Sequence, residues 1–275
     1  MIRDHDLQDR IEREREAHTE RDVLAENARI KSRFPHLESY PSRARFDAII
    51  EEHTRDLSGK TVLDYGCGRG EESLTFLRRG AEKVHGIDIS PVYVGYAAKC
   101  AQESGFPEDR YGFHVMDAHS LSFPDESFDL VSGRAILHHL DADTALGEIY
   151  RVLKPGGRVL LYEPLADNPL LKLFRHLTPH ARTKDEKAFS GKEIARLLRR
   201  EDWEAELAYC GLFEAPVAMI TSVVMRGRAD NFLLHLADKG ECWTHRRGVL
   251  LSWNQYVLFN MVKKTKSVIS ESVPE

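Results

Sequence analysis

The chain has 275 residues, of which 42% are hydrophobic and 30% charged, and its formal net charge is −5 at pH 7. This length suits one α/β domain with additions and can bury a sizeable core. The acidic balance disfavours a general nucleic-acid-binding protein, which would usually be basic.

Four scattered cysteines, at positions 67, 100, 210 and 242, form no Cys-x-x-Cys pair. This spacing indicates neither a metal site nor a disulfide framework, so we expect a cytoplasmic protein. The first residues lack the apolar core of a signal peptide. The most apolar window, 207–225, is interrupted by Glu214 and Pro216, so we expect no membrane span.

Residues 3–33 mix Arg and Glu densely, a pattern typical of a solvated helix. Residues 42–57 carry Phe46, Ile49 and Ile50 at helical spacing, which predicts a helix packed on a sheet. We assign 1–57 to an N-terminal helical extension and 58–275 to the main domain. The charged part suits either a simple extension or a cap over a ligand.

Residues 61–70 have the sequence Thr-Val-Leu-Asp-Tyr-Gly-Cys-Gly-Arg-Gly, which predicts a strand, a tight turn and the start of a helix. Alternating glycines let the backbone approach a ligand closely, and the helix presents its free N–H groups to that ligand. A dinucleotide-binding turn would have its third glycine at position 71. Because that residue is Glu71, NAD is disfavoured.

The turn instead resembles the first motif of class I S-adenosylmethionine-dependent methyltransferases, with Asp64 before Gly66, Gly68 and Gly70. The resemblance implies S-adenosylmethionine as cofactor and S-adenosylhomocysteine as product. It implies that the glycine turn, with Cys67, passes under the methionine part of the cofactor. Asp64 would help to hold the charged end through water or backbone.

From position 60 onward, apolar runs alternate with helical patterns, which predicts a doubly wound, mostly parallel α/β sheet with helices on both faces. The resemblance implies a Rossmann-like, seven-stranded sheet whose last strand is antiparallel. The second strand, 84–89, ends in Asp88, and an acid there can accept both ribose hydroxyls of an adenosine. Ile89 is assigned to the same cofactor site. Ser90 and Pro91 then predict the start of a helix.

A third strand over 111–116 closes with Asp117 and Ala118. The resemblance implies that Asp117 contacts the adenine amine and that the small Ala118 leaves room for the ring. The alternative for Asp117 is a turn-initiating role.

The fourth strand, entered from 125–132, is followed by Arg134 and then by an apolar pair with His138 and His139. This pattern resembles the small-molecule, methyltransferase type 11-like branch of the family, and Arg134 is assigned to the cofactor site. The Asn- or Asp-Pro-Pro-aromatic box of base-modifying members is missing, which disfavours a nucleic-acid base as acceptor. One histidine can act as a general base at the carboxyl end of the strand, and a packing role is the alternative.

The pattern over 144–153 predicts a helix, which ends at a Lys-Pro-Gly-Gly turn. The fifth strand is predicted over 158–162 and is followed by Glu163. Glu163 is a candidate catalytic residue that would equally suit holding a cationic amine. Residues 165–189 exceed an ordinary loop and predict a substrate lid, with Arg175, His180 and Arg182 as candidate substrate ligands. A solvated basic loop is the alternative.

Ser190-x-x-Glu193 is a capping box that begins a helix. Strands are predicted over 203–212 and 252–263, with a fairly apolar helical insertion over 214–250 between them. Three roles fit the insertion: enclosing an apolar substrate, peripheral contact with a membrane surface, and a dimer interface. The choice between monomer and homodimer stays open with them.

The predicted function is metal-independent transfer of a methyl group from S-adenosylmethionine to a small molecule by in-line displacement. No triad of acids marks a magnesium site, and the acceptor atom, O, N, S or C, stays open. His138, His139 and Glu163 are the candidate catalytic residues. The alternatives are an RNA or protein methyltransferase that docks through the basic segment 172–200, and a non-catalytic cofactor-binding protein of the same fold.

Overall fold

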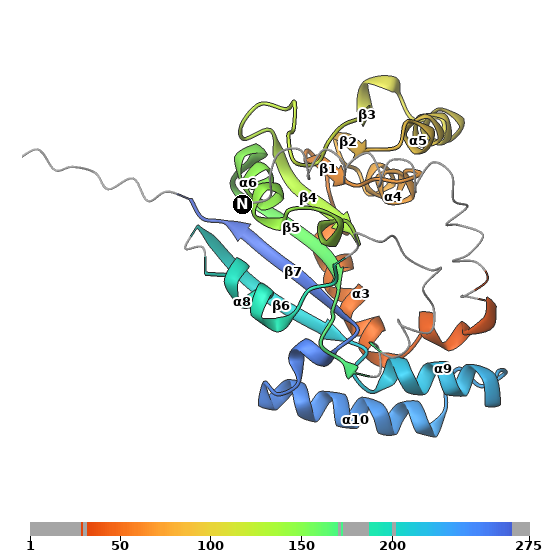
Figure 1. The fold of residues 1–275 in the computed structure, drawn as a ribbon. Helices are drawn as coiled ribbons and strands as arrows, with labels where there is room; N and C mark the ends of the chain where they lie inside the picture. The colour runs from red at the N-terminus through yellow and green to blue at the C-terminus, as the bar shows by residue number, and fades with distance from the viewer. Residues whose placement is uncertain (1–28, 30–31, 170–171, 173–186, 200–201, 266–275) are drawn as a thin grey trace, which may run out of the picture.

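The computed structural model describes residues 29, 32–169, 172, 187–199 and 202–265 (Figure 1). Within these residues one sheet contains the strands β1 (Thr61–Tyr65), β2 (Lys83–Asp88), β3 (Tyr111–Val115), β4 (Phe128–Arg134), β5 (Leu153–Pro164), β6 (Trp203–Cys210) and β7 (Tyr256–Lys263). Their order is β3-β2-β1-β4-β5-β7-β6. β7 runs antiparallel to β5 and β6, and the other neighbouring strands pair in parallel. The predicted seven-stranded, mostly parallel sheet with an antiparallel last strand is confirmed.

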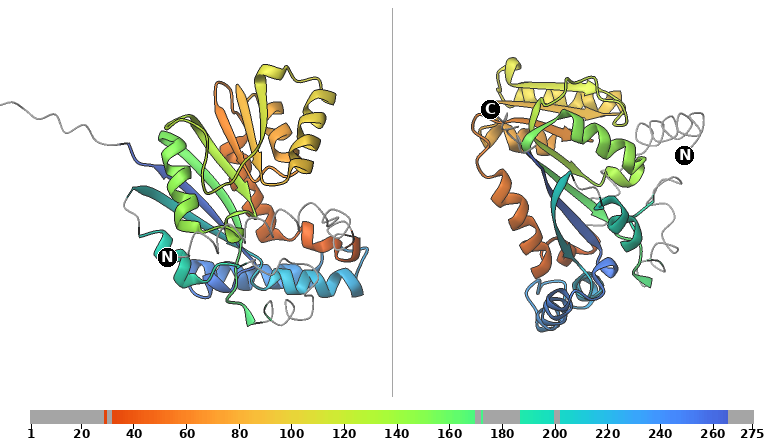
Figure 2. Two further views of the ribbon diagram at one scale, coloured as in Figure 1. Left: turned by 45° about the horizontal axis from the view of Figure 1, so that its top comes forward. Right: turned by 90° about the vertical axis from the view of Figure 1, so that its left-hand side faces the viewer.

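Helices cover both faces of this sheet (Figure 2). The helical elements of the described residues are η1 (Pro35–Glu38), α3 (Pro41–Thr54), α4 (Glu71–Arg78), α5 (Pro91–Glu103), η2 (Glu108–Arg110), η3 (Leu137–His139), α6 (Ala142–Val152), α8 (Gly191–Leu197), α9 (Glu214–Val224), α10 (Phe232–Arg247) and η5 (Leu251–Trp253). Helices α3, α4 and α5 contribute to the core on one face, and α6 and α8 to the core on the other.

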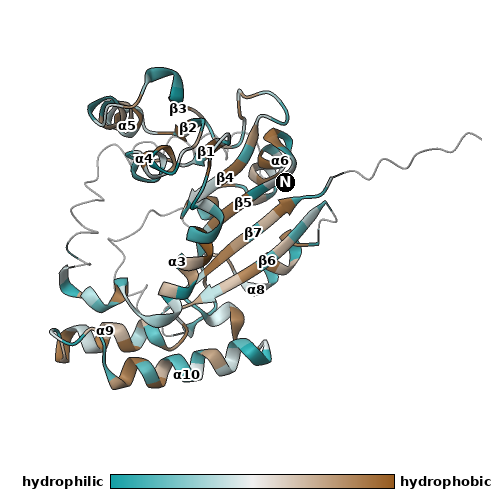
Figure 3. Cartoon of the chain, turned by 180° about the vertical axis from the view of Figure 1, so that it is seen from behind, coloured by the Kyte–Doolittle hydropathy of each residue, from teal (hydrophilic) through white to brown (hydrophobic). Residues whose placement is uncertain are grey.

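The central strands are apolar on both faces because helices cover both (Figure 3). In β1, Val62 packs toward α3 and α4 while its neighbour Leu63 packs toward α6. The same alternation recurs at Leu130 and Val131 of β4. Successive side chains of a strand point to opposite faces, so two cores share one sheet.

Helix starts match the predicted caps. Ser90 accepts a hydrogen bond from the backbone N–H of Tyr93 at 3.4 Å, and a proline comes next, in the first turn of α5. The predicted capping box is confirmed at α8. Ser190 Oγ accepts the N–H of Glu193 at 3.3 Å, and the Glu193 carboxylate accepts the N–H of Ser190 at 3.0 Å. These bonds satisfy N–H groups that a helix end otherwise leaves without partners.

The second and third strands differ from the predicted ranges by one residue at one end or both, and the last three strands differ more. The fifth strand begins at Leu153 rather than 158, because Leu153 pairs with Phe128 before a register shift and the ladder resumes at Leu130 and Arg158. The sixth strand ends at Cys210 rather than 212. The seventh begins at 256 because residues 251–253 form the short helix η5.

The insertion between β6 and β7 is helical, as predicted, and forms the α9–α10 hairpin at the carboxyl ends of the parallel strands. Two buried glutamates hold it. The Glu241 carboxylate accepts the N–H groups of Gly211, Phe213 and Glu214 at 2.8–3.3 Å. Glu214 in turn accepts the backbone N–H of Ser42, in the first turn of α3, at 2.7 Å. The hairpin is therefore tied to both β6 and α3.

The N-terminal part is described at residue 29 and from residue 32 onward, and α3 matches the predicted helix before the first strand. Residues 1–28 lie outside the described residues, so the division at residue 57 stays a prediction. Among the described helices, none has the length and apolar character needed to cross a membrane.

Candidate cofactor and active site

The three glycines of the turn after β1 have left-handed backbone conformations, with φ between +50° and +82°. A Cβ atom on Gly66 would meet the Ile136 side chain at 2.8 Å, and one on Gly70 would meet Ala97 at 2.8 Å. A Cβ atom on Gly68 would meet nothing within 4 Å. Two glycines therefore allow close packing within the protein, and Gly68 alone faces open space.

Asp88, at the end of β2, holds this middle glycine. One carboxylate oxygen accepts the N–H of Gly68 at 2.9 Å, and the other accepts the N–H of Ser90 at 2.9 Å. A carboxylate has about four acceptor positions, so these backbone bonds are compatible with ribose hydroxyls as further donors. The half-buried Ile89 is the next residue.

Asp64 lies deeper than its predicted role suggests. Its carboxylate is 4% exposed and accepts a 2.5 Å hydrogen bond from Ser73 Oγ in α4. Burial raises the pKa of Asp64 to about 7, against the opposing effect of the Ser73 hydrogen bond. The visible bond fixes the glycine turn to α4. Sequence reasoning missed Ser73, because a serine inside a helix gives no local sign of such a tether.

The thiol of Cys67 is almost fully buried below the turn. Burial raises the pKa of the Cys67 thiol, and the nearby Asp64 and Asp88 raise it further. The residue is therefore a neutral wall of the turn and no nucleophile.

The end of β3 positions Asp117 and Ala118. Tyr65 Oη donates a 2.5 Å hydrogen bond to the carbonyl of Ala118. Asp117 bonds to Nδ1 of His119 at 2.8 Å, and Nε2 of His119 accepts the N–H of Asp141 at 2.9 Å. Since Nε2 accepts, Nδ1 carries the proton and donates it to Asp117.

His119 therefore orients the proposed adenine contact, a role that sequence reasoning missed. Burial alone would raise the pKa of Asp117, but hydrogen bonds from the ring and backbone N–H of His119 lower it below its ordinary value. The Asp-x-His spacing was a local signal, because an Asp side chain often bonds the backbone two residues on.

Arg134, the last residue of β4, lies on the α3 and α4 side of the turn. Its guanidinium is 3.5 Å from the Glu72 carboxylate in the first turn of α4. It also stands over the Tyr162 ring, 5.5 Å from the centroid. Tyr162 Oη accepts a 2.7 Å hydrogen bond from Arg43 of α3. Two cations therefore flank one tyrosine beside the glycine turn.

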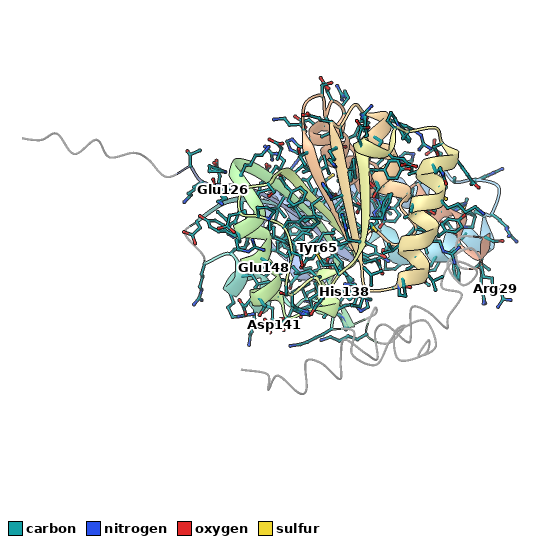
Figure 4. All side chains as sticks on the ribbon, turned by 90° about the horizontal axis from the view of Figure 1, so that it is seen from above. Arg29, Tyr65, Glu126, His138, Asp141 and Glu148 are labelled. Carbon is teal, nitrogen blue, oxygen red and sulfur yellow. The ribbon has the colours of Figure 1, made fainter. Side chains whose placement is uncertain are left out.

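The two histidines lie in η3, directly after β4, and Figure 4 labels His138. Glu163 ends in a fully buried carboxylate that accepts the N–H groups of Ile136, Leu137 and His138 at 2.8–3.3 Å. The same carboxylate is 2.7 Å from His138 Nδ1. The His139 ring is half-buried and lies 4.1 Å from the His138 ring, centroid to centroid.

This geometry changes the interpretation of Glu163. Four hydrogen bonds from residues 136–138 surround a carboxylate with no exposed surface. The suggestion that it holds a cationic substrate finds no support in this burial. Its visible role is to fix the η3 turn and the His138 ring.

Both ends of the predicted lid are anchored near the histidines. The N–H of Phe189 donates to the carbonyl of Pro164 at 3.0 Å, and the N–H of Lys187 donates to the carbonyl of His138 at 3.2 Å. Arg175, His180 and Arg182 lie outside the described residues, as does the interior of the segment at 173–186. Their predicted role as substrate ligands stays a prediction.

Residues 63–161 match the family model for a methyltransferase domain. Residues 63–161 form a class I S-adenosylmethionine-dependent methyltransferase domain. The match begins in β1 and ends in β5, so it contains the glycine turn, Asp88, Asp117 and both histidines.

Known proteins of several reactions resemble this methyltransferase domain. A 2-methyl-6-phytyl-1,4-hydroquinone methyltransferase of Synechocystis is 45% identical over 100 residues, which are 36% of this chain and 30% of that protein. Phosphoethanolamine N-methyltransferase 2 of Haemonchus contortus, solved with S-adenosylmethionine, superposes with a TM-score of 0.59 at 21% identity, over 81% of this chain and 53% of that one. The [4+2]-cyclase SpnF superposes with a TM-score of 0.54 at 24% identity, over 80% of each chain.

The matches are partial. The chain spans 48% or less of the length of the curated relatives that it matches first. At 24% identity or less, the structural likenesses show the fold alone.

The cofactor of this class, S-adenosylmethionine, fits the residues of the turn. Its ribose diol requires acceptors, which Asp88 offers, and its adenine amine requires an acceptor, which Asp117 offers. The open space above Gly68 admits a ligand that a side chain would exclude. Within the described residues, no group of three His, Cys, Asp or Glu side chains is placed to hold a metal ion.

Proposed function

We propose that the methyltransferase domain transfers a methyl group from S-adenosylmethionine to a small-molecule acceptor. The observation that carries the proposal is the cradle at Gly68, which opens to empty space while the Asp88 carboxylate holds its N–H at 2.9 Å. Asp117 and Ala118 stand at the end of β3, the strand next to β2 in the sheet. A nucleoside that lies across these strand ends would contact the turn at Gly68, the Asp88 carboxylate and Asp117.

When bound, S-adenosylmethionine supplies an electrophilic methyl group. The residues of the turn then have to fix that group in line with the acceptor and keep water away. The buried tethers perform the first task. Ser73 fixes Asp64, and His119 fixes Asp117, so the contacts come from side chains that are already held in place.

We assign the acid–base role to His139 and a positioning role to His138 and Glu163. His139 is the more exposed of the two rings, since His138 is 3% exposed and is bonded to the buried Glu163. A neutral histidine accepts a proton near pH 7 and so can take the acceptor proton. Glu163 keeps η3 at the end of β5, where that exchange would occur.

A small-molecule acceptor is supported by the relatives and by the sequence. The Synechocystis relative is named for a hydroquinone substrate. The segment after β4 lacks the aromatic box of base-modifying methyltransferases. The same proposal includes Arg175, His180 and Arg182 of the lid as substrate ligands. It leaves open whether the acceptor atom is O, N, S or C.

A second reaction class must be separated by experiment, because a [4+2]-cyclase shares this fold. The purified chain should be incubated with S-adenosylmethionine carrying a labelled methyl group and a panel of small hydroxylated, amine, thiol and carbon acceptors. Mass spectrometry should find a product that gained one labelled methyl, together with S-adenosylhomocysteine.

The test variant is Asp88→Ala, and its matched control is Asp109→Ala. Asp109 is an exposed acid of η2, far from the turn in the sequence. Asp88→Ala should weaken S-adenosylhomocysteine binding by one to three orders of magnitude, because charge-assisted hydrogen bonds contribute about 1.5–3 kcal/mol each. Tight cofactor binding without any methylated product across the panel would contradict methyl transfer and favour the non-transfer class.

A further inference from the structure

The α9–α10 hairpin ends in a cluster of exposed apolar side chains, which we call the hairpin tip. Its members flank residues 225–231, the link between the two helices, and each is at least 38% exposed. They are Ile220, Val223, Val224, Phe232, Leu233 and Leu236. Figure 3 shows hydrophobic and hydrophilic stretches alternating along both helices. Single exposed apolar residues are ordinary, whereas a contiguous group marks an interaction site.

The exposed apolar residues of α9 are not an extension of the core, because α9 places its small or polar residues inward. The buried positions of α9 include Ala215, Ala218, Thr221 and Ser222. The last two bond to the buried His36 of the N-terminal segment. A surface helix of a soluble domain normally turns its large apolar residues inward and its polar residues outward. Helix α9 shows the reverse arrangement, so the composition of its outer face suits contact with an apolar partner better than contact with water.

Most of the exposed charged side chains around the tip are cations. Asp238 of α10 pairs with Arg45 at 2.7 Å, and Glu241 is fully buried. Asp230 is the exposed acid of the link, and it lies 2.6 Å from His235. The exposed cations of the link and of α10 are Arg226, Arg228, Lys239, Arg246 and Arg247. The outer surface of the hairpin therefore combines apolar side chains with an excess of positive charge.

We propose that the hairpin tip docks on an anionic phospholipid surface. Helices that lie in a membrane interface combine large apolar and aromatic side chains with Lys and Arg, and anionic lipids attract the cations. Phe232 and Trp243 are the exposed aromatic residues of α10, and Arg247 stands over the Trp243 ring. Because neither helix can span a bilayer, the contact is peripheral.

Charge argues against a second copy of the chain as the occupant. A two-fold interface brings the same patch of both copies together. It would place the cations of one hairpin against those of the other, while the exposed acid of the link, Asp230, is already engaged by His235. An anionic surface complements the same charges instead.

The position of the hairpin relates the docking to the candidate cofactor site. Helices α9 and α10 leave and rejoin the sheet at the carboxyl ends of the parallel strands, the edge at which Asp88, Asp117 and Glu163 lie. A bilayer at the tip would therefore lie on the side of the molecule that carries the candidate cofactor site. The docking itself does not depend on methyl transfer.

The test is sedimentation of the full chain with two kinds of vesicle: phosphatidylcholine alone, and phosphatidylcholine with one third phosphatidylglycerol. We expect binding to the anionic vesicles, weaker binding as salt rises, and little binding to the neutral ones. Phe232→Ser with Leu236→Ser should lower the partition coefficient by about tenfold or more. Lys239→Glu should lower it by about tenfold.

The matched controls lie on α5. Val92 is 54% exposed and Lys99 is a well-exposed helical lysine, so Val92→Ser and Lys99→Glu change the same chemistry elsewhere. Both should leave vesicle binding unchanged, and circular dichroism melts should show that every variant folds. Equal binding to neutral vesicles, absence of binding, or tip variants that bind like the wild type would overturn the proposal. Self-association that the tip variants abolish, without vesicle binding, would assign the tip to a second copy.

Discussion

Gly68 differs from its neighbouring glycines in what its α-carbon faces. Gly66 and Gly70 are closed off by Ile136 and Ala97, so a methyl group there would collide with the protein itself. At Gly68 it would enter the space in which the proposed cofactor lies. Loss of fold and loss of binding can therefore be separated within one short turn.

The first prediction compares Gly68→Ala with Gly59→Ala. Both glycines have positive φ and neither has an atom within 4 Å of the added methyl, but Gly59 precedes β1 at the opposite edge of the sheet. Each substitution should cost about 1–2 kcal/mol of folding free energy, because an L-residue is strained in this conformation. Only Gly68→Ala should weaken S-adenosylhomocysteine binding, by tenfold or more in calorimetry. Equal affinities in the two variants would remove Gly68 from the binding site.

The second prediction concerns the histidines. His139→Asn should lower the single-turnover rate by about 10²–10⁴-fold with little change in cofactor affinity, which is the usual cost of losing a general base. Glu163→Gln should lower the melting temperature, because an amide NH₂ would face the N–H groups of residues 136–138.

The measurement that separates the two roles is the single-turnover rate set beside the melting temperature. His139→Asn should lower the rate and leave the melting temperature nearly unchanged, whereas Glu163→Gln should lower the melting temperature, because the glutamate holds the η3 backbone and the His138 ring. A wild-type rate in His139→Asn at every pH would mean that alignment and exclusion of water suffice for the transfer.

At the scale of the element, local patterns predicted the features that arise between near neighbours in the chain. The glycine turn, the capping box at Ser190 and the acid at the end of β2 all depend on residues within a few positions, so periodicity and cap chemistry revealed them. The surroundings of Glu163 could not be predicted in this way, since its partners lie 25–27 residues away in the chain.

The same limit applies to the insertion. Its helices could be predicted from composition, but the role of Glu241 could not. That carboxylate reaches back 27–30 residues to the loop after β6, and no spacing rule links the two segments. A glutamate on a helix is usually solvated, and only the folded chain shows this one to be buried.

The third prediction tests this anchor with Glu241→Ala and the control Glu204→Ala. Truncation of Glu241 removes the acceptor of the Phe213 and Glu214 N–H groups, at about 1–3 kcal/mol for each, while the Gly211 N–H keeps Ser42 Oγ as a second acceptor at 3.3 Å. Urea unfolding should show a loss of about 3 kcal/mol or more, and hydrogen exchange should speed up at residues 211–214. Glu204 is exposed on β6, so its truncation should change stability by less than about 0.5 kcal/mol. Comparable losses in both variants would contradict the anchor.

At the scale of the whole molecule, two buried acids couple stability to pH. Burial raises the pKa of Asp64 to about 7. Burial likewise raises the pKa of Glu214 above its ordinary value, and the neighbouring Glu241 adds to the rise. A folded state that holds such protons more tightly than the unfolded chain loses stability as pH rises through the folded pKa.

The fourth prediction is that the cofactor-free chain becomes less stable between about pH 5 and pH 8, by at most about 1.4 kcal/mol per pH unit for each group. At the acid end the sign reverses. Hydrogen bonds from Lys187 and Ser190 outweigh burial and lower the pKa of Glu193 to about 2. The ionised Glu193 therefore stabilises the folded state, and this stabilisation is lost as the pH falls from the ordinary pKa of a glutamate toward 2. Urea titrations at several pH values should place the maximum near pH 5.

Asp64→Asn provides the internal control for this slope, because the amide keeps an oxygen for Ser73 and cannot ionise. It should flatten the decline between pH 5 and pH 8, whereas Asp109→Asn on the exposed η2 should not. A wild-type chain that gains stability toward pH 8 would show that the proton on Asp64 is not held by the fold.

The α9–α10 hairpin leaves and re-enters the sheet at a single pair of residues. Cys210 and Tyr256 are neighbours in the β6–β7 ladder, and the N–H of Gln255 bonds to the carbonyl of Cys210 at 3.0 Å. The β6–β7 ladder therefore closes before the hairpin begins, and a change within residues 211–255 should leave the register of these strands intact. The contacts of Glu214 with Ser42 and of Ser222 with His36 limit which changes the segment tolerates, because they join it to the chain before β1.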